Sequence, residues 1–381
     1  MKQVFPCIPP VRQRYEMNAI TIIMVVFSML GAADRIFGSR FGLGKEFERG
    51  FMLLGTMALS MIGMIVISPW IADILAPVFD IVQKTVGFDP SIIPASLFAN
   101  DMGGAPLSVE VAHNSEVGLF NALVVSSMMG CTISFTIPFA LGVVEKEHHS
   151  SMLLGFLCGI VTIPVGCFVG GLVCALPMKT LLWNLLPLIL FSGLITCGLF
   201  FFPMKCVKVF AVFGTGMKIL ITIGLALGIL RYLTGIEILP GLATLEEGGL
   251  VCLNASAVMS GAFPLMFLLS KLLVKPLQKI GARIGINETA ALGFISSLAT
   301  SVTTYGMVGR MDRRGIVLNS AFAISGAFTF AGHLAFTMAF DGNYVFPMII
   351  GKLVAGVSAV FLAVIIDRKT SEKPAETEAA A

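Results

Sequence analysis

Two segments of the sequence, residues 87–113 and 285–309, place polar residues and glycines inside otherwise apolar stretches. The first segment contains a carboxylate, Asp101, at mid-length, whereas the second offers only hydroxyls there. A carboxylate binds an ammonium group strongly, and a hydroxyl can bind a second polar group of the same solute. The pattern predicts an asymmetric site for a small polar cation. The candidate substrate-binding residues are Asn100, Asp101, Gly103, Gly104, Ser301, Thr303 and Thr304.

The same residues also have structural interpretations. Asp101 can cap the second half-helix of its segment, which is compatible with substrate contact. A bare carboxylate costs about 2.5–3.5 kcal/mol at the centre of a bilayer, and this cost favours a functional role. Paired glycines allow unusual dihedral angles and close approach of the backbone to a ligand. Ser and Thr in membrane helices often bond only to their own backbone, so the hydroxyl segment remains open to both interpretations.

Further polar residues lie within or beside apolar stretches. An intramembrane histidine often serves a proton or ion path, although a lone buried histidine is more often structural. Intramembrane asparagines more often join helices, and a glutamate near the exit of residues 87–113 can face water. The candidate residues for a proton or ion path are His333, Glu110, Asn121 and Asn319. Snorkelling of the side chain toward the interface explains the charged residues near span ends, which are Asp34, Arg35, Asp73, Asp80 and Lys352.

The composition is that of a membrane protein. Hydrophobic residues make up 56% of the 381 residues and charged residues only 12%, against about 25% charged in soluble domains. The basic residues lie in short loops, so no nucleic-acid partner is expected. No HExxH, GxSxG or phosphate-loop motif is present. Ser325 and His333 are eight residues apart, about 12 Å along a helix, which is too far for a nucleophile and its base. The chain is therefore predicted not to be an enzyme and to need no cofactor or metal.

Hydropathy predicts an all-α polytopic fold with nine spans. In addition to these spans, the segments 87–113 and 285–309 are either full crossings or re-entrant hairpins. Treating both as re-entrant places most loop Lys and Arg residues on one side with the C-terminus inside, whereas two full crossings divide them almost evenly. The re-entrant interpretation is therefore preferred. The nine predicted spans are 17–37, 50–79, 117–144, 150–176, 180–203, 209–233, 250–270, 315–340 and 345–366.

The two halves of the chain resemble each other at a spacing of about 198–200 residues. Gly87 matches Gly285 and Asn121 matches Asn319 at this spacing, and LLGFLCGIV (153–161) resembles IIGKLVAGV (349–357), 196 residues later. Similar halves whose hairpins enter from opposite faces form an inverted-topology repeat, which is typical of secondary transporters. The predicted organisation is an N-terminal extension (1–16), a first repeat (17–176), a linking helix (180–203), a second repeat (209–366) and a disordered polar tail (367–381).

Several motifs together resemble the ethanolamine permease family, the EutH membrane proteins of ethanolamine-utilisation operons. The resemblance runs from about Asn18 to Ile366 and implies an importer of ethanolamine in the bacterial cytoplasmic membrane. It also implies that the substrate feeds ammonia-lyase degradation, often inside a microcompartment. The motifs are DMGG (101–104), SMMGCTISFTIPFALGVVE (127–145), GIVTIPVGCFVGGL (159–172), GMVGRMDRRG (306–315) and VFPMIIGKLVAGV (345–357).

Two places depart from the family pattern. The second hairpin has Thr300-Ser301 and Thr303 where the family has consecutive Asn residues and a Pro, and Gly332 stands where an Asp precedes the histidine. Both changes remove polar groups, so a carrier of another small amine, coupled to H⁺ or Na⁺, stays an alternative. A membrane scaffold or sensor for the ethanolamine-utilisation machinery is a third hypothesis. The expected partners are ethanolamine or a similar amine, the lipid bilayer, H⁺ or Na⁺, and further copies of the chain in a homo-oligomer.

Overall fold

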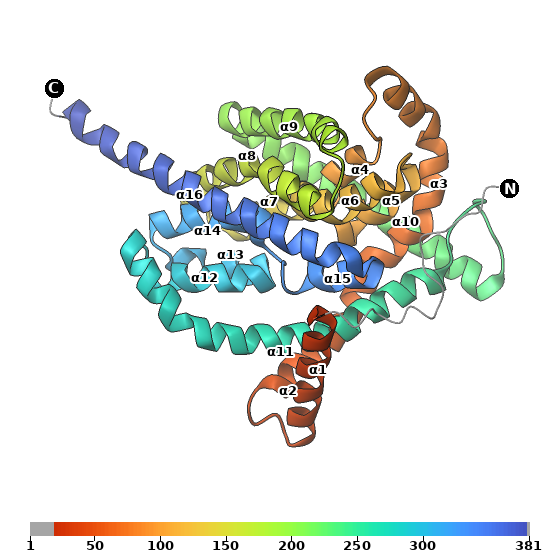
Figure 1. The fold of residues 1–381 in the computed structure, drawn as a ribbon, viewed down its shortest axis with the longest axis horizontal. Coiled ribbons are helices and arrows are strands. Elements are labelled where there is room, and N and C mark those ends of the chain that lie inside the picture. The colour runs from red at the N-terminus through yellow and green to blue at the C-terminus, as the bar shows by residue number, and fades with distance from the viewer. Residues whose placement is uncertain (1–18, 379–381) are drawn as a thin grey trace.

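The computed structural model describes residues 19–378, which form a bundle of helices without any strand in that range (Figure 1). This confirms the prediction of an all-α polytopic membrane protein. Eight helical segments of the described residues are long and apolar enough to cross a bilayer. They are α1 (Ala19–Ile36), α2–α3 (Leu43–Val86), α6–α7 (Ser115–Val143), the segment containing α8 (Lys146–Val173), α9 (Met178–Phe201), α10 (Pro203–Thr234), α11 (Leu245–Ile284) and a short 3₁₀ turn with the first part of α16 (Gly342–Asp367).

The predicted span 315–340 is not one continuous helix, because it is broken near its middle. The helix α14 (Arg313–Gly326) ends, and α15 (Gly332–Phe340) begins only after an irregular stretch. Two backbone bonds to another segment hold this stretch, because the N–H groups of Phe328 and Phe330 donate to the carbonyls of Ser297 and Leu298, both at 2.9 Å. The freed backbone groups are thus satisfied by a neighbouring helix, which is how a membrane protein tolerates a broken span.

The first hairpin segment contains two short helices, α4 (Ile92–Leu97) and α5 (Gly104–Val111), on either side of a 3₁₀ turn at Asn100–Met102. One carboxylate ties the two ends of the segment together. Asp89 accepts backbone N–H bonds from His113 at 3.1 Å and from Asn114 at 2.9 Å. Asn114 in turn caps α6 through a bond from the N–H of Val117. We call Asp89 and Asn114 the first clamp.

The second hairpin segment has the same design, with α12 (Glu288–Ala299) and α13 (Ser301–Gly306) meeting at Thr300. Here Asn287 caps α12, and Asp312 caps α14 and accepts the backbone N–H of Asn287 at 2.8 Å. We call Asn287 and Asp312 the second clamp. Each residue lies 198 positions after its counterpart in the first clamp, but the carboxylate and the amide have exchanged places.

Other equivalent contacts recur at the same spacing and support the inverted repeat, which stays a prediction. Gly87 ends α3 with φ of 82°, and Gly285 ends α11 with φ of 75°, a left-handed conformation that glycine adopts without strain. Asn121 donates to the hydroxyl of Ser91 at 2.8 Å, and Asn319 donates to the carbonyl of Ala290 at 2.8 Å. Each asparagine therefore joins its span to the start of its own hairpin.

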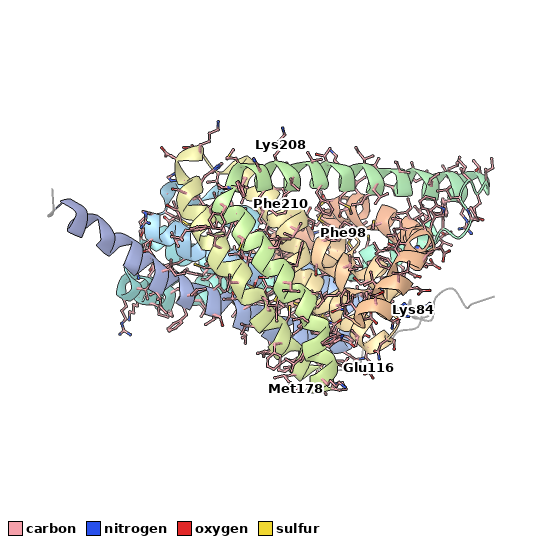
Figure 2. The ribbon with its side chains drawn as sticks, turned by 90° about the horizontal axis from the view of Figure 1, so that it is seen from above. Lys84, Phe98, Glu116, Met178, Lys208 and Phe210 are labelled. Carbon is pink, nitrogen blue, oxygen red and sulfur yellow. The ribbon has the colours of Figure 1, made fainter. Side chains whose placement is uncertain are left out.

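Of the eight candidate spans, α6–α7 is the most buried, and it is wound as π-helix over Asn121–Gly130 and Thr132–Thr136. Its apolar window is 83% buried, whereas that of α10 is 17% buried. The helix α10 accordingly runs along one edge of the bundle, with Lys208 near one end (Figure 2). Figure 2 also places Glu116 and Met178, near the starts of α6 and α9, at the opposite edge. The core therefore surrounds the π-helical stretch, and α10 is peripheral.

The helix α16 (Val345–Glu378) continues into the stretch predicted as a polar tail and extends away from the bundle (Figure 1). The predicted N-terminal extension, residues 1–16, lies outside the described residues.

Cysteine labelling is expected to test the re-entrant topology. In a variant whose native cysteines are replaced by alanine, Lys84→Cys and Ser115→Cys should both react with an impermeant maleimide from outside. Lys279→Cys and Gly309→Cys should react only after the membrane is opened, because the second hairpin is predicted to enter from the other face. All four positions are exposed, so access and not burial determines the result. Labelling of the two ends of either hairpin from opposite faces would contradict the topology.

Candidate functional site

The break in the first hairpin depends on two glycines. Gly103 has φ of 101°, and a Cβ there would also collide with Met64. A Cβ on Gly104 would collide with the carbonyl of Phe98, so the backbone turns back closely on itself. The helix α5 starts at this point without any side-chain cap. Asp101 therefore does not act as the cap of α5.

Asp101 instead lines a cavity of about 250 Å³. A Cβ built on Gly332 would lie 4.0 Å from Oδ2 of Asp101, so the carboxylate adjoins the first residue of α15. The positive end of a helix dipole favours an anion at such a position. The departure from the family pattern at Gly332 thus falls beside the predicted site.

His333 lines the same cavity, one residue after the break that precedes α15. Its Nδ1 is buried and has no hydrogen-bond partner among the described residues. Phe328 in the break has φ of 62°, an uncommon conformation for a bulky residue, and its ring centroid lies 5.3 Å from that of His333. Strained backbone of this kind is concentrated at functional sites. The structure thus brings together two predicted residues, Asp101 and His333, that are far apart in the sequence.

The remaining walls of the cavity are aromatic and hydroxyl-bearing. Phe135, from the π-helical part of the central span, packs edge-on against Phe328 at 5.6 Å between centroids. Thr56 and Ser60 line the cavity from α3. The sequence interpretation missed these residues, although the spacing of four between Thr56 and Ser60 puts both hydroxyls on one helical face. A carboxylate, two aromatic rings and two hydroxyls suit a small organic cation that carries a hydroxyl.

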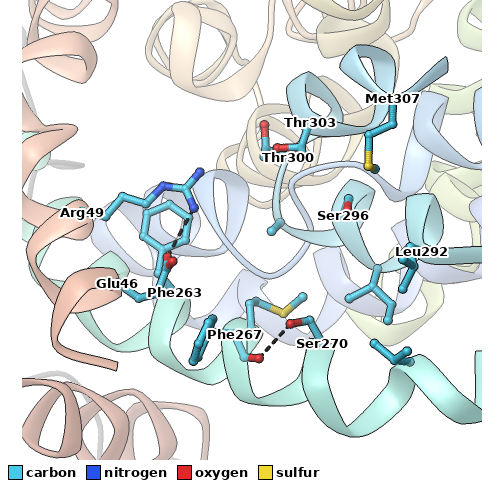
Figure 3. A pocket seen from close by; sticks show the side chains of 14 residues that line it. Glu46, Arg49, Phe263, Phe267, Ser270, Leu292, Ser296, Thr300, Thr303 and Met307 are labelled. Atoms are coloured by element: carbon cyan, nitrogen blue, oxygen red, sulfur yellow. Dashed lines mark hydrogen bonds and ion pairs between the residues drawn. The ribbon is translucent and has the colours of Figure 1, made fainter. Parts of the chain in front are cut away.

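Thr303 lies elsewhere. Figure 3 shows Thr300 and Thr303 facing Glu46 and Arg49 across a second cavity of about 320 Å³. The guanidinium of Arg49 lies 4.8 Å from the ring centroid of Phe263, and its Nη1 is 3.3 Å from Oε2 of Glu46. The hydroxyls at 300 and 303 are thus not in the cavity that contains Asp101.

One face of α2–α3 forms a wall of both cavities. Glu46 and Arg49 line the second cavity, and Leu53, Thr56 and Ser60 line the first. Their separations of three or four residues place all five side chains on one helical face.

The other predicted substrate-binding residues are buried. The hydroxyl of Thr304 donates to the carbonyl of Gly293 at 3.1 Å and lies 2.9 Å from the hydroxyl of Ser297. Ser301 and Asn100 are each 0% exposed, and their side-chain polar atoms have no partner among the described residues. Their roles as ligands stay a prediction.

The candidate residues for an ion path lie in different parts of the fold. Asn121 exchanges hydrogen bonds with Asn184 of α9 at 2.7 and 3.2 Å, in addition to its bond to Ser91. These contacts agree with a helix-joining role for Asn121. Glu110 of α5 interacts electrostatically with Asp73 of α3 and Glu247 of α11 and does not line the cavity of Asp101.

Snorkelling does not describe Lys352 or Asp34, and that interpretation was wrong for both. Lys352 is 1% exposed and donates from Nζ to the carbonyl of Ser127 at 2.7 Å. Its helix packs against α8 and the π-helical stretch, which leaves the side chain no route to the interface. Asp34 is 5% exposed and accepts the N–H groups of Phe41 and Gly44, so it stabilises the turn before α2.

Comparison with known proteins finds relatives that align with this chain over almost its whole length. The sequence profile of the family described as "Ethanolamine utilisation protein, EutH" matches residues 17–366. A protein of Listeria monocytogenes named "Probable ethanolamine permease EutH" is 44% identical over 359 residues, covering 94% of this chain and 96% of the relative. A protein of the same name from Salmonella typhimurium is 37% identical over 400 residues, covering 95% of this chain and 98% of the relative. An "Uncharacterized protein YxeR" of Bacillus subtilis is 38% identical over 342 residues, covering 90% of this chain and 92% of the relative.

No solved structure matches this chain. The family profile covers most of the chain, and the relatives align over almost their whole lengths. The chain therefore belongs to the EutH family of ethanolamine utilisation proteins.

Proposed function

We propose that this protein is a carrier that imports ethanolamine across the bacterial cytoplasmic membrane, with its C-terminus in the cytoplasm. The observation that carries the proposal is the cavity of Asp101, where a carboxylate, two phenylalanine rings and two hydroxyls meet beside a broken span. The names of the Listeria and Salmonella relatives support the choice of substrate. A membrane scaffold would have no need of such a cavity.

The proposed pose uses the two ends of the substrate separately. Protonated ethanolamine has an ammonium and a hydroxyl joined by two carbons. The ammonium binds the carboxylate of Asp101 and faces the rings of Phe135 and Phe328, which attract a cation. The hydroxyl binds Thr56 or Ser60, which line the same cavity from α3. The volume of about 250 Å³ lies below the roughly 300–1,000 Å³ of pockets for drug-sized ligands, which suits a solute of few heavy atoms.

The hydroxyl pose predicts a loss of selectivity in Thr56→Val. Ethylamine has the ammonium of ethanolamine but lacks its hydroxyl. Loss of one neutral hydrogen bond costs about 0.5–1.5 kcal/mol, so the preference for ethanolamine over ethylamine should fall about 2–10-fold. Competition of each amine with labelled ethanolamine in proteoliposomes measures the preference.

Ser301→Ala is the matched variant, because it tests the hydroxyl that the sequence predicted in the second hairpin. It should leave the preference unchanged. A loss in Ser301→Ala with none in Thr56→Val would assign the substrate hydroxyl to the second hairpin. Proteoliposomes that accumulate no ethanolamine with the wild-type protein would refute the proposed function.

A further inference from the structure

Lys352 is among the largest fully buried side chains, and it carries a charge-bearing group in the middle of a membrane helix. Its ammonium has three N–H donors, of which the described residues satisfy one, through the carbonyl of Ser127. Burial of an ammonium with incomplete hydrogen bonding and no counter-ion is strongly unfavourable. Lys352 is therefore stable in this place only when a negative charge lies nearby or when it has given up its proton.

Packing does not explain a lysine at this position. In the alignment of LLGFLCGIV (153–161) with IIGKLVAGV (349–357), Lys352 corresponds to Phe156, and Gly351 corresponds to Gly155. Phe156 is 0% exposed, so the equivalent site of the first repeat is filled by an apolar side chain. An ionisable group where an apolar one suffices indicates a functional role.

Four titratable groups interact electrostatically with Lys352, each from a different segment: Asp101, Cys131, Cys167 and His333. Buried thiols in apolar surroundings remain neutral, and a histidine is neutral or positive. Asp101 is therefore the one member of the four that supplies a negative charge.

The position of Lys352 relative to the cavity follows from the same neighbours. Asp101, Cys131 and His333 all line the cavity, whereas Lys352 does not. The ammonium thus lies behind the cavity wall. No direct ion pair joins Lys352 to Asp101 within the described part of the chain, and the carboxylate remains open to a ligand on its cavity side.

We propose that Lys352 is the exchangeable countercharge of Asp101, and that binding of one substrate ammonium ion releases one proton from Lys352. In the empty site, a carboxylate faces a lysine ammonium. In the occupied site, the same carboxylate binds the substrate ammonium, Lys352 is a neutral amine, and its proton has passed to water. The site keeps the same net charge in both states, so no uncompensated positive charge is buried. This inference rests on the proposed function and adds its proton stoichiometry.

The test is calorimetric titration of the purified full-length protein with ethanolamine, in two buffers that differ in ionisation enthalpy. The difference in heat gives the number of protons released, which should be about one for the wild-type protein by proton linkage. Lys352→Arg keeps a permanent positive charge beside Asp101, so it should release about no proton and should bind ethanolamine at least about tenfold more weakly. Lys84→Met removes an exposed lysine and should behave as the wild type.

The results separate the inference from the proposed function. Ethanolamine binding by the wild type without proton release, or with equal release in Lys352→Arg, would overturn the role of Lys352 and leave the proposed function standing. Absence of binding by the folded wild type would overturn both. If Lys352→Arg does not yield folded protein, Lys352→Gln makes the same test at about pH 8.5, above the usual range of carboxyl pKa values, where Asp101 stays ionised without its countercharge.

Discussion

Asp101→Asn is expected to weaken ethanolamine uptake at least tenfold while the protein still inserts into the membrane. The carboxylate lines the cavity and does not cap α5, so its replacement removes the proposed substrate contact and no helix cap. A hydrogen bond to a charged group contributes about 1.5–3 kcal/mol, which corresponds to about 10–150-fold in affinity. The measurement is the concentration dependence of labelled ethanolamine uptake, normalised to the amount of protein in the membrane.

The matched control is Glu116→Gln, which neutralises an exposed carboxylate at the start of α6. Uptake by this variant should equal that of the wild type. Wild-type affinity in Asp101→Asn would show that the substrate binds elsewhere or as the free base.

Asp89→Ala is expected to lower the free energy of unfolding by roughly 3 kcal/mol, through loss of the first clamp. The carboxylate of Asp89 accepts four hydrogen bonds, from the N–H and hydroxyl of Ser91 and from the N–H groups of His113 and Asn114. Removing it frees both ends of the hairpin at once. Thermal unfolding in detergent should show the change as a lower melting temperature. Asp341→Ala removes a loop carboxylate with one backbone bond, to Asn343, and should have a much smaller effect.

The double variant Asp89→Asn with Asn114→Asp tests the clamp more directly. It gives the first hairpin the order of residues that the second hairpin already has in Asn287 and Asp312. Most of the stability lost in Asp89→Asn should return in the double variant, because the carboxylate can then accept the N–H of residue 89. If the losses of stability from the two substitutions add up in the double variant, the exchanged order of carboxylate and amide does not restore the clamp.

The membrane class, eight spans and the position of the first break follow from hydropathy and from the polar residues that interrupt it. The break between α14 and α15 was missed because residues 326–332, GAFTFAG, lack a charge or a proline. That break is stabilised by backbone bonds to Ser297 and Leu298, and no local pattern reports such distant contacts.

The site was predictable only in part, for a related reason. Asp101 and His333 are conspicuous because each is a polar residue in an apolar stretch. Thr56 and Ser60 are not, since hydroxyls are common in membrane helices and often bond to their own backbone, as Ser60 does to the carbonyl of Met57. Lys352 was misinterpreted because hydropathy gives the position of a residue along a span but not the neighbours that bury it.

The exchanged order of the two clamps has a consequence for how the predicted repeat is recognised in the sequence. Compared position by position, Asp89 against Asn287 and Asn114 against Asp312 count as two unrelated mismatches. In the folded chain they are one conserved arrangement, because the backbone N–H of the amide residue donates to the carboxylate of its partner in both clamps. A single substitution from either order leaves two carboxylates or two amides at the hairpin base. We therefore expect the two positions of each pair to change together among relatives, so that covariation would reveal a similarity that residue identity does not.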